Sequence, residues 1–276
     1  MNLKNKLQAL QNNDLATLTP TETEALLEEF LANMGHPDPQ LRDSLIYSTF
    51  VKIFQANLLS ENQWHHVVKH CLSDQGLYHH LGDTNSDTVF TRSFSALFLV
   101  VSLIADSQTP FLSQDQFGEV LHKTTRYFQQ ELDVRGFVPQ KGWAHAIAHG
   151  ADLLGAVASH PKFEAAQSEK ILAAIQNFLL SPHPSLKDQE EIRLAATIPL
   201  LLDKGLSITV LTQWLEALFN GIEALDYGDS FYSEQHYTAW QTRYNVINFL
   251  KAVYFKLKET YPDVAGVAYK LIKNHV

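Results

Sequence analysis

Apolar residues recur every three or four positions along almost the whole sequence, and no segment alternates convincingly between apolar and polar residues. The first pattern is typical of amphipathic α-helices, whereas alternation would be typical of half-buried β-strands. A chain that has only the helical pattern must bury its apolar stripes by packing helix against helix. The sequence therefore predicts an all-α protein.

Capping signals predict where several helices begin. Three Ser or Thr residues are followed three positions later by Glu or Gln, which is the capping-box spacing: Thr19 with Glu22, Ser60 with Gln63, and Ser113 with Gln116. Two more helices are expected to start at Asp38 and at Asp87, or at Ser86 just before it. Later helices are expected over residues 143–159, 163–180, 187–203, 208–224, 233–259 and 262–273.

Short connections between roughly ten or eleven helices favour stacked antiparallel hairpins. Hairpins of roughly 40 residues approach the period of HEAT and armadillo repeats, although the sequence shows no sharp repeat. We therefore expect an irregular α-α superhelix, with a closed α/α toroid as the alternative. No segment has linker composition, so residues 1–276 are predicted to form a single all-helical domain.

Charge and apolar content exclude several classes of partner. A net charge of −9 argues against binding to a nucleic-acid backbone. The longest apolar run, Ala96–Ala105, is much shorter than the about 20 residues of a membrane-spanning helix, so we expect a buried core helix there. The first residues lack the apolar stretch of a signal peptide. We therefore expect a cytoplasmic protein that neither binds nucleic acid nor spans a membrane.

The segment KGWAHAIAHGADLLG, residues 141–155, places three polar groups in a small and apolar stretch. Each helical residue advances about 100°, so His145, His149 and Asp152 would share one stripe. Two imidazoles one turn apart can hold a divalent metal, to which the carboxylate could add an oxygen ligand. Alternatively, Asp152 could orient His149 as a general base. The three groups could also form a buried hydrogen-bonded network.

Arg92 lies in a strongly apolar predicted helix, where a guanidinium needs a carboxylate or several carbonyl partners. Candidate partners are Asp133, Asp152 and Asp226. Arg92 could form an internal ion pair with one of them, or it could clamp an anionic ligand. The loop that carries Asp133 and Trp143 leads directly into the histidine segment and could shape the mouth of a pocket.

Arg243 raises the same question in a later helix. Its neighbours are Trp240, Tyr244 and Asn248. These side chains could form an aromatic and amide wall beside Arg243, or they could simply pack between helices.

Three segments together resemble a known family: DTVFTRSFSALFL, RGFVPQKGWAHAIAHGADLL and WQTRYNVINFLKAVYFKL. The chain is similar to a bacterial family catalogued as domain of unknown function 2785. The resemblance extends from about the second predicted helix to the end of the chain. It implies an all-helical cytosolic protein, and it implies no activity.

Two classes of function fit these patterns. The first is a peptide-binding, protein-binding or scaffolding module with a polar groove around the histidine segment, which needs no cofactor. The second is a hydrolase of a small anionic substrate, in which the histidines and Asp152 hold a divalent metal or act as a base. The candidate groove residues are Arg92, Asp133, Trp143, His145, His149, Asp152 and Arg243, and the candidate metal ligands are His145, His149 and Asp152.

Overall fold

A computed structural model describes residues 3–11, 15, 18–273 and 275 of the chain. Helices account for 69% of the structure, and its described part contains two strands of two residues each. The protein is therefore all-α, as the apolar periodicity predicts. The superhelix and the toroid stay predictions.

The chain divides into two compact units, which we describe separately. Unit 1 comprises Met1–Lys123 and Glu131–Leu153, and unit 2 comprises Thr124–Gln130 and Leu154–Val276. Two of the three boundaries fall inside helices, namely α6 (Gln114–Gln130) and α7 (Ala146–Ser159). The single domain stays a prediction.

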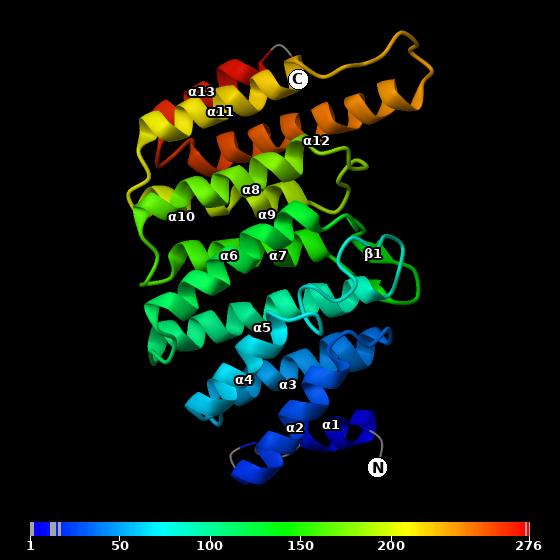
Figure 1. Cartoon of the computed structure of the whole chain (residues 1–276), viewed down its shortest axis with the longest axis vertical. Helices are drawn as coiled ribbons and strands as arrows, with labels where there is room; N and C mark the ends of the chain where they lie inside the picture. The colour runs from blue at the N-terminus through cyan, green and yellow to red at the C-terminus, as the bar shows by residue number, and fades with distance from the viewer. Residues whose placement is uncertain (1–2, 12–14, 16–17, 274, 276) are drawn as a thin grey trace. The chain divides into compact units, whose positions relative to one another are not determined.

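Unit 1 is built around α5, a helix that is buried on most sides. Phe98 of α5 lies face to face with Phe50 at 4.0 Å between ring centroids. The helix is long and apolar enough to cross a membrane, but 78% of its apolar stretch is buried within the structure, as in a core helix. The core helix α5 spans Thr88–Gln108, and Figure 1 labels it together with most of the other elements of this unit. These are α1 (Leu3–Gln11), α2 (Pro20–Asn33), the π-helix η2 (Gln40–Tyr47), α3 (Ser48–Gln55), α4 (Glu61–Cys71), β1 (Phe137–Val138) and β2 (Gly142–Trp143).

Unit 2 is organised by α12, which packs against α9, α11 and α13 (Figure 1). Val246, Leu250, Val253 and Leu257 recur along the inner face of α12 and are fully buried. The elements are η3 (Ala165–Gln167), α8 (Ser168–Leu180), α9 (Glu190–Ala195), α10 (Thr197–Asp203), α11 (Ile208–Glu223), α12 (Glu234–Leu257) and α13 (Pro262–Ile272). The opposite face of α12 is left uncovered over much of its length.

The predicted helix starts hold wherever a side chain caps the backbone. Both halves of the capping box form at Thr19 and at Ser60, and Ser113 and Gln116 also exchange hydrogen bonds. The helix predicted over residues 187–203 is wrong in its bounds, because Gln189 has a left-handed φ of 69° and helix begins only at Glu190. That region also divides into α9 and α10.

Candidate functional site

A short hairpin in unit 1 leads into the histidine segment. Phe137 pairs with Trp143, and Val138 pairs with Gly142, in antiparallel register. Gly142 has a φ of 75°, and a Cβ atom there would lie only 2.9 Å from Pro39, so glycine is needed for both reasons. The side chains of Phe137 and Trp143 stay 55% and 45% exposed.

The helix predicted to start at Trp143 starts instead at Ala146. Trp143 belongs to a strand, and His145 has a left-handed φ of 49°, so neither can be part of the helix. The prediction that three polar groups share one helical stripe is therefore wrong for His145. His149 and Asp152 do lie on α7, and all three side chains are half-buried.

A buried arginine that the sequence reasoning missed anchors this hairpin. Arg42 of η2 donates from Nη1 to the carbonyl oxygen of His36 at 2.9 Å and from Nη2 to that of Lys141 at 2.8 Å. Its guanidinium lies 4.1 Å from the ring centroid of Phe90. Burial lowers the pKa of Arg42 and raises the pKa of its neighbour Asp43. The signal was an arginine in an apolar helix, the same signal that drew attention to Arg92.

His149 takes part in a hydrogen-bonded network. Its Nδ1 lies 2.7 Å from Oγ of Ser93, a fully buried residue that donates to the carbonyl oxygen of Ala144. Because the hydroxyl has one proton to donate, Nδ1 of His149 carries the proton shared with Ser93. This network ties α5, the histidine loop and α7 together. The buried-network alternative therefore describes His149.

Aromatic rings surround the two histidines. The ring of His145 lies 4.3 Å from that of Trp143 and 5.8 Å from that of His149, measured between centroids. Asp152 acts on a neighbouring ring as well: the pKa of Tyr47 is raised mainly by burial and secondly by the negative charge of Asp152. The divalent metal site at His145, His149 and Asp152 stays a prediction.

Arg92 forms the internal ion pair, but with a partner that the sequence did not suggest. Its Nε and Nη2 donate to the two carboxylate oxygens of Glu131 at 2.6 and 2.9 Å, and both side chains are fully buried. The carbonyl oxygens of His79 and Asp83 accept from its other donors. The proposed partners among the aspartates are wrong, and every nitrogen of Arg92 is engaged inside the protein, so it cannot clamp a ligand.

Asp133 has a structural partner as well. It lies 2.6 Å from Nη2 of Arg135, and it accepts from the backbone nitrogen of Asn85 at 3.0 Å. Arg135 also donates to the carbonyl oxygen of Ser86 at 2.7 Å. Asp133 therefore holds two loops of unit 1 together.

The outer face of α12 in unit 2 carries a stack of exposed rings. Tyr237, Trp240 and Tyr244 are 60%, 47% and 43% exposed. Neighbouring rings are nearly parallel, with 9° and 6.1 Å between Tyr237 and Trp240, and 20° and 5.5 Å between Trp240 and Tyr244. The spacing of three and four residues places all three rings on one face of the helix.

Arg243 lies beside this stack. Its Nη1 donates to Glu223 at 2.7 Å, and this hydrogen bond is the main reason why the pKa of Arg243 is raised. A hollow of about 280 Å³ is lined by Trp240, Arg243, Tyr244, Ile247, Asn248, Lys251 and His275. The structure thus brings together the aromatic and amide wall suggested for Arg243.

A second hollow on α12, of about 620 Å³, shares Asn248 and Lys251 with the first. Its remaining lining residues are Glu191, Ile192, Ala252, Phe255 and Lys256. The two hollows therefore adjoin each other along α12, between Trp240 and Lys256, and we refer to the pair as the α12 groove. The sequence could not indicate this groove, because periodicity does not tell which large side chains a neighbour covers.

Comparison with known proteins identifies a family. The model of a family described as "Protein of unknown function (DUF2785)" matches residues 77–255. No curated protein and no solved structure matches the chain.

Proposed function

This chain belongs to the DUF2785 family, and because that family brings no known activity, we propose a function from the geometry: the protein is a binding module that holds a peptide or protein segment on the outer face of α12. The observation that carries the proposal is the stack of Tyr237, Trp240 and Tyr244. Contiguous exposed apolar surface marks interaction sites in soluble proteins. Tyr and Trp are also the residues that most often dominate the energy of an interface.

The groove beside the stack favours an acidic helix as the occupant. Arg243, Lys251 and Lys256 line it together with the carboxylate of Glu191. Arg243 is already paired with Glu223, so Lys251 and Lys256 supply the positive charge offered to a partner. A helix rises about 1.5 Å per residue, so the stretch between Trp240 and Lys256 is on the order of 24 Å long and matches about four turns of a partner helix. An amphipathic helix would place its apolar stripe on the rings and its acidic residues near the cations.

The hairpin beside the histidine segment offers a smaller surface for the same role. The rings of Phe137 and Trp143 pack edge to face at 5.2 Å and are about half exposed. These two rings provide less surface to bury than the three stacked rings on the face of α12. We therefore place the main docking surface on α12 and not around the histidines.

The hydrolase alternative has less support. It assigned to Arg92 the role of holding an anionic substrate, and Arg92 is paired with Glu131 inside unit 1. It also used His149 as a ligand or base, and Nδ1 of His149 is shared with Ser93. A measurement of bound metal tests whether His145, His149 and Asp152 hold a divalent ion.

A displayed library of helical peptides tests the proposal. Selection on the wild-type protein should enrich peptides that carry Asp and Glu beside an apolar stripe with a spacing of three and four residues. Trp240→Ala should weaken their binding at least about tenfold, because central aromatic residues contribute about 2 kcal/mol or more. Tyr232→Ala is the matched control, since that ring is 95% exposed and lies before α12.

Two results would contradict the proposal that the outer face of α12 binds a partner. One is enrichment of peptides that bind the Trp240→Ala and Tyr244→Ala variants as tightly as they bind the wild type. The other is a concentration-dependent dimer that Trp240→Ala dissociates in sedimentation, because a second copy would then occupy the face.

A further inference from the structure

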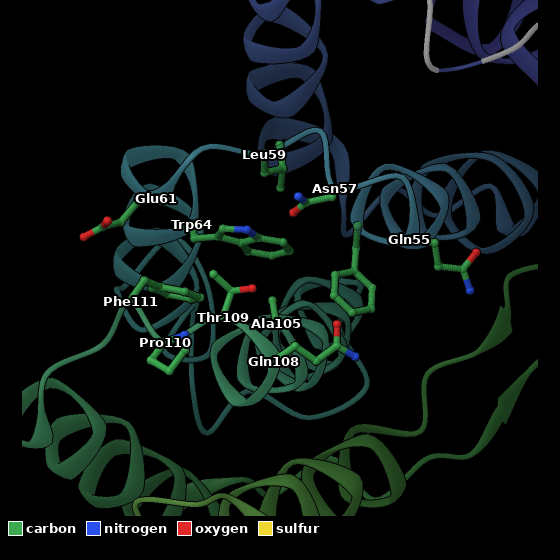
Figure 2. A pocket seen from close by; sticks show the side chains of 11 residues that line it. Gln55, Asn57, Leu59, Glu61, Trp64, Ala105, Gln108, Thr109, Pro110 and Phe111 are labelled. Atoms are coloured by element: carbon green, nitrogen blue, oxygen red, sulfur yellow. The ribbon is translucent and has the colours of Figure 1, made fainter.

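A cavity in unit 1 lies outside every site considered above. It has a volume of about 400 Å³ and opens where α3 ends, α4 begins and α5 ends (Figure 2). Aromatic rings form its walls, from Phe54 on α3, Trp64 on α4 and Phe111 after α5. This cavity belongs to the other compact unit, so nothing about it depends on the proposed role of α12.

The three rings lie close to one another in the wall of the cavity. Trp64 and Phe111 are nearly parallel, with 14° between their planes and 5.9 Å between centroids, whereas Phe54 is nearly perpendicular to Trp64 at 6.0 Å. Figure 2 shows the Trp64 ring in the middle of the opening, with Phe111 to one side and Asn57 and Leu59 above it. Aromatic faces carry negative electrostatic potential and attract cations within about 6 Å.

The polar groups of the cavity carry no positive charge. Glu61 is the one charged residue among the described residues that line it, and the lining includes no Lys, Arg or His. The carboxylate of Glu61 lies at the rim, 3.6 Å from Nε2 of His65, and in Figure 2 it points away from Trp64. It therefore acts at the entrance and not against the rings.

Two helix ends add to the negative potential. α3 ends at Gln55 and α5 ends at Gln108, and both of these residues line the cavity. The carboxyl end of a helix carries the equivalent of about half a negative charge. The amino end of α4, which starts at Glu61, carries the opposite partial charge, and the carboxylate of Glu61 offsets it. The ring faces and the two carboxyl ends therefore favour a cation.

We infer that this cavity binds an organic ammonium ion, with the alkylated nitrogen held among Phe54, Trp64 and Phe111. The amides of Asn57 and Gln108 and the hydroxyl of Thr109 are placed to hydrogen-bond polar groups attached to the same ligand. Such an ammonium ion can come from a small free amine or from the side chain of a lysine in a peptide.

Ligand-observed NMR on the full chain distinguishes charge from shape. The probes are choline, its neutral isostere 3,3-dimethylbutan-1-ol, and N-acetyl-lysine methylamide. Choline should bind at least about tenfold tighter than the neutral isostere, because only the cation gains from the ring faces. Its methyl signal should also move upfield, since a group above an aromatic ring is shielded.

Variants place this binding in the cavity. Gln108→Lys introduces a positive charge at an exposed lining position and should abolish choline binding, whereas Gln129→Lys, at an exposed position on α6 outside the lining, should leave it unchanged. Phe111→Leu should weaken binding severalfold by removing one ring. Trp64 is 7% exposed, so its replacement would also remove core packing, and the test therefore does not depend on it.

The two ligand sources give different results that both support the inference. Tighter binding of choline identifies a small free cation as the ligand, and tighter binding of the lysine derivative identifies a peptide side chain. The inference fails if the neutral isostere binds as well as choline, if Gln108→Lys leaves choline binding intact, or if neither cation binds saturably at tens of millimolar.

Discussion

Nη2 of Arg42 and the carbonyl oxygen of Lys141 lie 2.8 Å apart, although 99 residues separate them in the sequence. The same guanidinium contacts the ring of Phe90 on α5. One buried cation therefore fixes η2, the core helix and the hairpin to one another. Trp143 lies at the open end of that hairpin, paired with Phe137 and 45% exposed.

Replacing Arg42 with Met should lower the free energy of unfolding by about 3–5 kcal/mol, because buried carbonyl oxygens and Asp43 lose their donor. Arg42→Lys keeps the charge but cannot reach His36 and Lys141 together, so it should lie between Met and the wild type. Urea unfolding measures both. A loss below 1 kcal/mol for Arg42→Met would show that the anchor is dispensable.

The pair of Arg92 and Glu131 should behave as a coupled unit. Arg92→Met leaves a buried carboxylate without its partner and should cost about 3–5 kcal/mol. The double variant Arg92→Met, Glu131→Gln removes both charges, so its loss should be smaller than the sum of the two single losses by about 1–3 kcal/mol. Additive losses in a double-mutant cycle would contradict a direct interaction.

His183 should make unit 2 sensitive to acid. Burial lowers the pKa of His183 to about 4 in the folded protein, from 6.5 for an unperturbed histidine. Between pH 6.5 and pH 4, His183 is protonated in the unfolded chain but stays neutral in the folded protein. The free energy of unfolding therefore falls as the pH drops from about 6.5 to 4. The full loss is on the order of 3 kcal/mol.

The matched variant for this effect is His183→Phe. It keeps a ring against Phe178, whose centroid lies 4.5 Å from that of His183 in the wild type. Its unfolding free energy, measured from pH 7 to pH 4, should fall less steeply than that of the wild type. Parallel curves would mean that His183 is protonated in the folded protein as easily as in the unfolded chain.

Metal analysis separates the two classes of function. A binding module needs no metal, so mass spectrometry on protein purified without a histidine tag should find no stoichiometric zinc, manganese or iron. The control is the double variant His145→Ala, His149→Ala. Stoichiometric metal in the wild type that disappears in this variant would instead support the hydrolase alternative.

The helices could be predicted because their signals are local. An apolar stripe or a capping box involves residues within one or two turns, as at Thr19 and Ser60. The start of α7 depends on distant residues, since Gly142 must pass close to Pro39 for the hairpin to form. A reading of the histidine segment alone therefore extends the helix too far, through His145 and Trp143.

The candidate site was harder to predict for a similar reason. The sequence shows that Arg92 needs a carboxylate, but the path of the chain decides that Glu131 reaches it and Asp133 does not. It also shows aromatic residues on α12 without showing that Trp240 stays uncovered. Which groups meet, and which remain exposed, is a property of tertiary packing.

The alternation of the two units along the chain has a consequence for inheritance. Residues 124–130 belong to unit 2, whereas the residues on either side of them belong to unit 1. No single cut of the gene therefore separates the two units: a cut after residue 153 leaves residues 124–130 of unit 2 with unit 1, and a cut after residue 123 leaves residues 131–153 of unit 1 with unit 2. A recombination event with a single breakpoint in this region would therefore carry a piece of one unit along with the other, and the family match from residue 77 to residue 255 includes parts of both.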